Sequence, residues 1–423
     1  MHLKNFDPYD FEKHDVHGVP VYVKNLPWAP CIHVRIVFGT GAFDDPAGKE
    51  GLSHFFEHLA FNGSSPKFSD RKVIKEWSKT YTLGSWNAAT NFYQVFYLFR
   101  CLPEHYETVL DGVKDLIFHN DLSAEDIEHE RKVILQEAWK NFQNEKFLEY
   151  SKKVSTILFH GHEHERFVRP LGWPDTIQNI SRDDIVTWHR AYYGIGNFFI
   201  VLAGAVEPYH IEALEKFLDD LPKVRPAHNQ RTMVSRPKQN RLVSIADDIG
   251  QIQEQVEIEM MRILPAISAE KNQIVSLFSR LFQDILHERL RLERGLCYSV
   301  SAGVDLSKTY STAYVSVKTE EKNIDIVEKE VRAILQEIQG KQHADRFEKI
   351  KILYKEQVES REDMSSGVVD TVLRDISRFG RVITDAEDIR LIEQATYADI
   401  AEFARHAFDP EYVFTDIVLP SKK

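Results

Sequence analysis

The chain carries an internal repeat, and this repeat limits the possible folds more than any other feature of the sequence. The segment from Thr176 to Tyr193 is echoed, at a constant offset, by the segment from Leu391 to Phe408. In both copies a polar, helix-like stretch precedes an apolar strand, at residues 198–202 and 412–419. Self-similarity of this kind indicates that one supersecondary unit occurs twice. The simplest fold is therefore a duplicated α+β domain.

The length of the chain agrees with two domains in tandem. A chain of 423 residues is too long for one average hydrophobic core. The polar, Pro-containing stretch at 223–240 separates the two copies, so we predict an N-terminal domain at 1–222 and a homologous C-terminal domain at 241–423. The predicted fold class is α+β, with two homologous α/β-sandwich domains that each consist of a mostly antiparallel sheet covered by helices.

Composition excludes several classes of protein. Apolar residues make up 43% and charged residues 28% of the chain, as in globular proteins, and no apolar run approaches the ~20 residues that cross a bilayer. The net charge of -12 argues against nucleic acid as a partner. Residues 1–7 lack the basic start and apolar core of a secretion signal. We therefore expect a cytoplasmic protein that binds neither nucleic acid nor a membrane.

Local patterns predict several further elements. Alternating apolar residues predict strands at 19–23 and 31–38 joined by a turn, and the aromatic stretch 85–99 predicts one more strand. A pattern close to a capping box at 123–126 begins a long helix that runs towards Tyr150. Apolar residues spaced between 325 and 337 predict an amphipathic helix that covers a sheet.

The segment from Gly51 to Phe61 contains the pattern His-x-x-Glu-His. On a helix, His54 and His58 stand one turn apart on the same face, with Cβ atoms about 5–6 Å apart, so both imidazoles could bind one metal ion. Glu57 could then reach a water on that ion without being a ligand. Random placement of 18 His and 65 acidic residues gives about 0.1 such patterns in a chain of this length. The alternative is that both histidines are ordinary polar residues of a half-buried helix.

Two acidic residues of the predicted helix after 123 are candidates to complete a metal site. Glu130 and Glu137 share a helix face but lie about 10 Å apart along the axis, so one ion cannot easily bind both. One carboxylate could be a ligand while the other supports it. A catalytic zinc site usually has three protein ligands and leaves the fourth position to water. The alternative is that both acids belong to a solvated helix face.

Two further stretches allow more than one interpretation. Asn87 and Ala88 are weak strand formers at the start of the 85–99 strand, which is typical of an exposed sheet edge, although an ordinary internal strand is an equally good interpretation. His160, His162 and His164 alternate and could bind a metal if they were extended, but a short His-rich tract is only a compositional signal. The sequence contains no phosphate-binding loop and no nucleophile elbow.

Together these motifs resemble those of the pitrilysin or insulinase group of zinc metallopeptidases, the inverzincins, in the short two-domain form of mitochondrial processing peptidase subunits and their bacterial relatives. The resemblance implies one Zn2+ per chain, bound by His54, His58 and Glu137. Glu57 is then the general base and Glu130 a supporting catalytic acid. The matching pieces cover nearly the whole chain and are Gly51–Gly63, Glu130–Glu137, Gly161–Gly172, Tyr192–Gly204 and Leu290–Ser299.

The resemblance also implies substrate contacts in both domains. Asn87 and Ala88 match an edge strand that pairs with the substrate backbone. Arg291 and Tyr298 match an Arg and Tyr pair that contacts bound peptide from the other domain, with Arg294 as a nearby competitor for the Arg. The C-terminal domain, which has no His-x-x-Glu-His pattern, is then an inactive copy that contributes substrate contacts.

The function that the resemblance implies is that of a zinc-dependent metalloendopeptidase. Glu57 would take a proton from the zinc-activated water and pass it to the leaving amine. Unfolded peptides would be hydrolysed in a clamshell chamber formed by two chains, and a homodimer is favoured over a heterodimer because this chain carries both motifs. One alternative is a non-catalytic peptide-binding or structural partner of the same fold. Another is an amidohydrolase-type metal enzyme that acts on small molecules.

Overall fold

The computed structural model describes residues 7, 9–167, 169–228, 236–360 and 365–422. The chain divides into two compact units, each made of three segments. Unit 1 comprises 1–141, 167–230 and 363–382, and unit 2 comprises 142–166, 231–362 and 383–423. The predicted linker at 223–240 lies partly outside the described residues, as does most of the N-terminal stretch 1–7.

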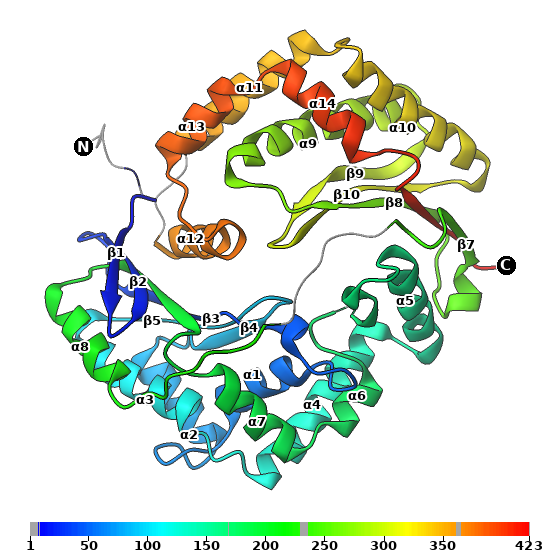
Figure 1. The fold of residues 1–423 in the computed structure, drawn as a ribbon. Helices are drawn as coiled ribbons and strands as arrows, with labels where there is room; N and C mark the ends of the chain where they lie inside the picture. Colours follow the sequence, from blue (N-terminus) through cyan, green and yellow to red (C-terminus); the bar gives the residue numbers. More distant parts are fainter. Residues whose placement is uncertain (1–6, 8, 168, 229–235, 361–364, 423) are drawn as a thin grey trace. The chain divides into compact units, whose positions relative to one another are not determined.

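Unit 1 is built on a six-stranded sheet (Figure 1). Its strands, in spatial order, are β1 (Glu12–Val16), β2 (Val19–Asn25), β6 (Phe198–Gly204), β3 (Ile32–Phe38), β5 (Val95–Cys101) and β4 (Asn87–Thr90). Only the β2–β6 pair is parallel. The predicted strands at 19–23 and 31–38 are both present, but β6 lies between them, so they are not neighbours in the sheet.

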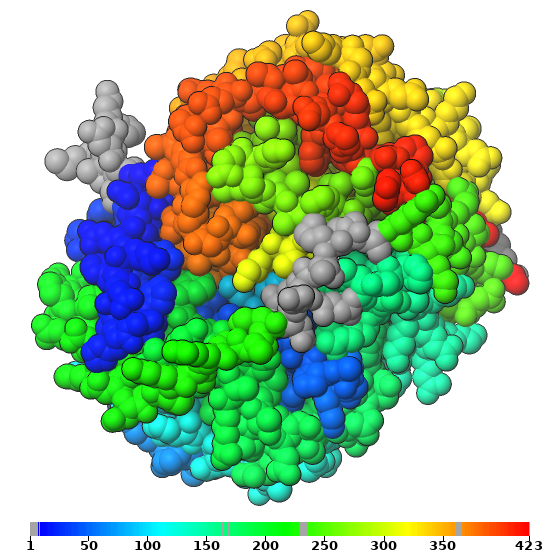
Figure 2. Space-filling view, viewed as in Figure 1, coloured from blue at the N-terminus to red at the C-terminus, as the bar shows by residue number. Residues whose placement is uncertain are grey.

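Helices cover this sheet and shape the site. One face carries α1 (Leu52–Asn62), α3 (Tyr106–Phe118) and α7 (Arg182–Tyr192). The other helices of the unit are α2 (Arg71–Tyr81), α4 (Ala124–Phe142), α6 (Pro174–Asn179), α8 (Pro208–Leu218) and α12 (Ser365–Phe379). Figure 2 shows β1 at the surface, in dark blue, beside the green segment that carries α8.

Unit 2 repeats this plan with five strands. The spatial order is β7 (Arg241–Ile245), β11 (Phe414–Leu419), β8 (Val256–Pro265), β10 (Tyr310–Thr319) and β9 (Cys297–Leu306). Its helices are α5 (Glu145–Leu158), α9 (Asn272–Leu286), α10 (Ile324–Gln339), α11 (Ala344–Glu359), α13 (Asp385–Gln394) and α14 (Tyr397–Ala407), and a π-helical turn follows α9 at His287–Glu293. The amphipathic helix predicted near 325–337 is therefore confirmed as α10.

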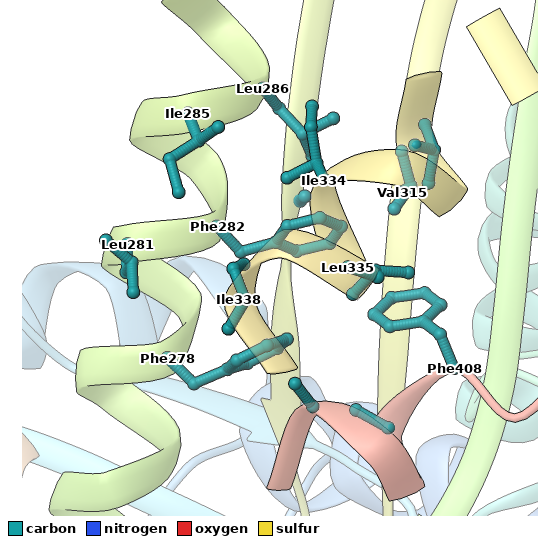
Figure 3. Close-up of a cluster of buried hydrophobic side chains, with 14 of the residues drawn as sticks. Phe278, Leu281, Phe282, Ile285, Leu286, Val315, Ile334, Leu335, Ile338 and Phe408 are labelled. Atoms are coloured by element: carbon teal, nitrogen blue, oxygen red, sulfur yellow. The ribbon is translucent and has the colours of Figure 1, made fainter. Parts of the chain in front are cut away.

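The core of unit 2 lies between its sheet and the helices α9, α10 and α14. Figure 3 shows Phe278, Phe282 and Leu286 of α9 packed against Ile334 and Ile338 of α10. All five side chains are fully buried. Burial of side chains of this size stabilises a fold by about 1.5–3 kcal/mol each, so this cluster holds the helical layer on the sheet.

The structure confirms the duplication predicted from the repeat. The first copy forms α6, α7 and β6, and the second forms α13, α14 and β11. Both copies begin their second helix with the same capping box, Ser181 with Asp184 and Thr396 with Asp399. The final strand then inserts parallel to β2 in unit 1 and parallel to β7 in unit 2. The chain thus contains two α/β domains with the same topology.

The single strand predicted at 85–99 is wrong, because the stretch forms two antiparallel strands, β4 and β5. The side chain of Asn91 accepts hydrogen bonds from the amides of Tyr93 (2.7 Å) and Gln94 (2.8 Å), and the Asn91 amide donates to the Gln94 carbonyl (2.9 Å). An Asn side chain that bonds to the backbone two residues on is a turn signal. The turn formed by the Asn91 side chain reverses the chain between β4 and β5.

The continuous helix predicted from 123 towards Tyr150 is also wrong, since it is two helices, α4 and α5. Gln143 has a φ of 63°, which a helix cannot accommodate. Asn144 then caps α5 by accepting the amide of Phe147 at 3.0 Å. The amphipathic pattern continues across this break, which is why the pattern alone did not predict it.

The break affects the topology. One helix from the first half of the chain packs in unit 2, and one helix from the second half packs in unit 1. α5 belongs to the first half but packs in unit 2, where Ile157 and Leu158 join Leu242, Ile263 and Phe414. α12 belongs to the second half but packs in unit 1, where Val369 lies among buried residues of β2 and β6. The units are therefore composed differently from a division of the chain at 223–240.

An ion pair reinforces the α12 exchange. The guanidinium of Arg35, on β3, donates two hydrogen bonds to Asp370 of α12, at 2.8 and 3.0 Å. The Arg35 side chain is only 6% exposed. A buried guanidinium requires such a partner.

No helix among the described residues is long and apolar enough to cross a bilayer.

We predict that Val369→Ala destabilises unit 1 although residue 369 belongs to the second half of the chain. The side chain is 0% exposed, and loss of two buried methyl groups with the resulting cavity costs about 2 kcal/mol. Hydrogen exchange of the amides of β2 and β6 should accelerate accordingly. Arg374→Ala, on the exposed side of the same helix, is the control, and unchanged protection in Val369→Ala would contradict the packing described.

Candidate metal centre

The start of α1 is fixed by backbone packing and by one buried acid. Gly51, before the helix, has a φ of 99°, and a Cβ there would lie 2.5 Å from the Leu171 carbonyl oxygen. Gly172 packs as closely against Glu50, since its Cβ would lie 2.1 Å from the Glu50 carbonyl oxygen. Only glycine tolerates a positive φ together with such a close backbone contact. The turn at 171–172 therefore sets where α1 begins.

Because Gly51 has no side chain to cap α1, Asp45 takes that role. Its buried carboxylate accepts hydrogen bonds from the backbone amides of Gly51 (2.8 Å) and Ser53 (2.9 Å). Burial raises the pKa of Asp45 well above its usual range, although these hydrogen bonds oppose the shift. The capped helix then presents His54, Glu57 and His58 on one face.

Four side chains converge at this face. His54, Glu57 and His58 each have a possible ligand atom within 4.8 Å of the others. The Oε2 atom of Glu137, on α4, lies 3.9 Å from His54 Nε2 and 3.6 Å from His58 Nε2. The Glu57 Oε2 atom lies 3.8 Å from His54 Nε2. Two imidazole nitrogens and a carboxylate oxygen thus face one point, with a second carboxylate beside them.

These donors fit a zinc ion. Ligand atoms of a tetrahedral zinc at 2.0–2.2 Å are separated by about 3.3–3.6 Å, and the distances from Glu137 to the two imidazoles are close to that range. Nitrogen from His and oxygen from a carboxylate are ligands that zinc prefers. With His54, His58 and Glu137 as ligands, a fourth position would remain open beside Glu57.

Glu130 lies on the opposite side of the His58 ring from Glu137. Its Oε2 atom is 2.9 Å from His58 Nδ1, whereas Glu137 faces Nε2. The two acids, although two turns apart on α4, therefore contact opposite edges of one imidazole. A hydrogen bond to Nδ1 fixes the tautomer and orientation of a metal-binding histidine. Glu130 supports His58 and does not face the open position.

Electrostatics within this group differ from one side chain to the next. Burial and then the neighbouring His58 ring lower the pKa of His54 to about 4. Burial also lowers the pKa of His58, but the hydrogen bond to Glu130 and the Glu137 carboxylate 3.6 Å from Nε2 outweigh this and raise it to about 10. The adjacent His58 ring, 3.6 Å away, holds the pKa of Glu137 below its usual range.

Glu57 has the properties of a general base. Burial raises its pKa to about 7, close to the value that is most effective for proton transfer at neutral pH. Its Oε2 atom accepts a hydrogen bond from the Thr90 hydroxyl at 3.3 Å. Thr90 is the last residue of β4, so the end of this strand contacts Glu57 of α1.

The strand that carries Asn87 and Ala88 is at the sheet edge. Among the described residues β4 pairs with β5 alone, and Asn87 is exposed. The Ala88 amide donates to the Asn87 side chain at 3.0 Å. Of the two interpretations of this stretch, the edge strand is therefore correct. An exposed edge has unpaired backbone groups to which another extended chain can pair.

The residues that the resemblance assigned to the second domain lie in unit 2. Arg291 is in the π-helical turn and is exposed, and Tyr298, near the start of β9, is 53% exposed. Arg294 forms an ion pair with Glu330, while no ion pair of Arg291 is found among the described residues. This makes Arg291 the better candidate for a contact with another molecule.

The alternating histidines form no comparable centre. The rings of His162 and His164 lie near each other, with centroids 4.1 Å apart, and His164 is buried. In the part of the chain that the structure describes, the potential ligands that lie within reach of one ion gather at His54, Glu57 and His58, where Glu137 also approaches both imidazoles.

Sequence reasoning missed three residues that contact the centre or set its position: Asp45, Thr90 and Arg71, whose guanidinium lies 3.0 Å from Glu130. Asp45 lies with Asp44 and Glu50 shortly before a helix that follows a glycine, so an acid that caps this helix could have been suspected from the sequence, although not which one. No sequence pattern marked Thr90 or Arg71, because these residues become neighbours of the site only when the strands and helices pack.

Comparison with known proteins agrees with this geometry. Residues 21–167 match the family model described as insulinase, peptidase family M16, and residues 179–354 match the model described as the peptidase M16 inactive domain. The first match contains the candidate metal centre, and the second contains Arg291 and Tyr298.

Individual relatives carry corresponding names. An uncharacterized zinc protease of Rickettsia bellii is 21% identical over 408 residues, which are 93% of each chain. The mitochondrial-processing peptidase subunit beta of Neurospora crassa is 26% identical over 243 residues, or 55% of this chain and 48% of that protein.

Solved structures show the same fold. A protease from Helicobacter pylori has a TM-score of 0.82 at 19% identity, covering 97% of this chain and all of the other. The ferredoxin protease FusC, in complex with Arabidopsis ferredoxin, has a TM-score of 0.75 at 14% identity, covering 99% of this chain and 48% of the other. The chain belongs to peptidase family M16, the pitrilysin and insulinase group of zinc metallopeptidases.

Proposed function

We propose that this chain is a zinc-dependent metalloendopeptidase that hydrolyses unfolded peptides. One observation carries the proposal: His54, His58 and Glu137, from two separate helices, face one point beside the buried carboxylate of Glu57. A protein that only binds peptides has no use for a buried base at that position. The relatives named as zinc proteases support the same reaction class.

The residues have distinct roles in the proposed reaction. His54, His58 and Glu137 would hold one zinc ion, which when bound polarises the scissile carbonyl and makes water a better nucleophile. Glu57 accepts a proton from the attacking water and gives it to the departing amine nitrogen as the peptide bond breaks. Thr90 fixes the orientation of the Glu57 carboxylate through its hydroxyl.

Substrate binding is proposed to use the edge of β4. An extended peptide could pair with the backbone of Asn87 and Ala88, which mainly recognises the peptide backbone and so implies loose sequence specificity. Thr90 ends the same strand and bonds to Glu57, so a peptide that continues along the edge would reach the catalytic base. Arg291 and Tyr298 are proposed as further contacts.

We propose that two chains assemble as a homodimer around the substrate. A single chain supplies one metal-binding domain and one domain without the motif. Because this chain carries both the His-x-x-Glu-His residues and the Arg291 and Tyr298 pair, two identical chains have all the parts that two different subunits would supply. The alternative function is that of a non-catalytic partner subunit of the same fold, as expected if zinc binds without any turnover.

We predict that Glu57→Gln lowers kcat for an unfolded, fluorogenic peptide by about 100-fold to 10,000-fold, since that is the usual contribution of a general base. Zinc content should stay at the wild-type level because Glu57 is not a ligand. Peptide turnover and elemental analysis of the same preparation measure both quantities.

The control for this substitution is Glu125→Gln, at an exposed position in the first turn of α4. It should cleave the peptide as the wild type does. Full activity in Glu57→Gln would refute the proposed mechanism. If the zinc-loaded wild type cleaved no unfolded peptide, the non-catalytic alternative would be favoured.

We predict that Glu137→Gln binds zinc far more weakly than the wild type, because a neutral amide replaces a charged ligand. Dialysis against a chelator should remove zinc and activity from the wild type, and added zinc should restore both. In Glu137→Gln the same zinc concentration should restore neither. Equal zinc content in the two proteins would show that Glu137 is not a ligand.

The homodimer is tested by sedimentation equilibrium of the full chain. We expect a mass of twice the 49.1 kDa of one chain. Mixing Glu57→Gln with Arg291→Ala should also restore some activity, because mixed dimers contain one intact combination of the two motifs. A monomer with full peptidase activity would contradict the dimer proposal.

A further inference from the structure

Glu130 is a buried carboxylate whose two oxygens have different partners. The residue is 1% exposed. Its Oε2 atom is 2.9 Å from Nδ1 of His58, and its Oε1 atom is 3.0 Å from Nη2 of Arg71. A buried carboxylate must be compensated by hydrogen bonds or by an opposite charge. Each carboxylate oxygen of Glu130 has such a partner, His58 at Oε2 and Arg71 at Oε1.

Arg71 occupies a position that its own helix does not favour. It is the first residue of α2, directly after the capping residue Asp70. A cation at a helix N-terminus opposes the helix dipole, typically by about 0.3–1 kcal/mol. The side chain is 32% exposed, and its guanidinium lies against two acids of α4. Its contacts on α4 therefore account for its placement.

The contacts of Arg71 connect three helices around His58. Besides Glu130, its guanidinium lies 4.0 Å from Asp126, one turn earlier on α4. Asp126 accepts hydrogen bonds from Ser64, which follows α1, and from Ser123, which precedes α4. Arg71 thus adds α2 to the junction that already joins the end of α1 to the start of α4.

We propose that Arg71 is a positioning residue of the metal centre, which acts on the zinc ligand His58 through Glu130. This inference rests on the proposed zinc-binding function. The guanidinium fixes the Glu130 carboxylate, the carboxylate fixes Nδ1 of His58, and the ring then presents Nε2 towards His54 and Glu137. Without Arg71, Oε1 of Glu130 would lose its partner in a buried position, and the carboxylate could rotate away from the ring.

The geometry favours Arg over Lys at this position. Both contacts of Arg71 run through Nη2, whose two N–H groups have fixed directions in the planar guanidinium. A lysine has one flexible ammonium group and cannot hold the same geometry. Lysine should therefore rescue the loss of Arg71 only in part.

The test is zinc affinity, measured by competition with a chromophoric chelator, which needs no substrate. Loss of an outer contact to a metal-binding histidine typically weakens metal binding 10-fold to 100-fold. We expect a loss in that range for Arg71→Met and a smaller loss for Arg71→Lys. Lys75→Met, on the exposed side of α2, should bind zinc as the wild type does. Wild-type affinity in Arg71→Met would overturn the proposal.

A double-mutant cycle separates positioning from a general effect on folding. If Arg71 acts through Glu130, Arg71→Met should weaken zinc binding less than 2-fold in the Glu130→Ala background. An undiminished loss there would mean that Arg71 merely holds α2 in place, which overturns the proposal. If Arg71→Met does not fold, the same cycle with Arg71→Lys gives the decision.

Failure of this inference is distinguishable from failure of the proposed function. A wild-type chain that binds no zinc would refute the function itself. A wild-type chain that binds zinc, together with an Arg71→Met variant of equal affinity, would refute only the role of Arg71.

Discussion

The hydrogen bond between the His58 ring and the buried carboxylate of Glu130 joins α1 to α4, and the geometry of the whole centre depends on it. The two helices are separated by a helix, a hairpin and a further helix along the chain. Once Glu130 holds Nδ1, the next acid on the same face, Glu137, is directed at Nε2. The spacing of two helical turns between the acids is what lets them reach the two edges of one imidazole ring.

The part of the centre that lies on one helix could be predicted from the sequence. The order His54, Glu57, His58 is a local pattern, and helical geometry alone brings the side chains onto one face. Glu137 was different. Spacing indicated only that one of two acids could be a ligand, and it was the resemblance to a known family that selected it, because convergence of two helices is a property of tertiary packing.

Other features left no local trace. Thr90 and Arg71 are ordinary residues in the sequence and become relevant only when β4 and α2 pack beside α1 and α4. The turn at Asn91 and the break at Gln143 interrupt patterns that continue on both sides, so periodicity extended one strand and one helix too far. The repeat, in contrast, predicted the duplicated topology well, since both copies retain the same capping residues and the same final strand.

The helices exchanged between the two halves, α5 and α12, have a consequence for how such a chain can be divided. A cut in the stretch 223–240 would leave the first fragment without the helix that covers Tyr22 and Val201, and the second without the helix that covers Leu242 and Phe414. Each fragment would expose an apolar sheet surface that only the other fragment can cover. The two halves of this duplicated protein are thus no longer separable modules, and each has become a folding requirement of the other.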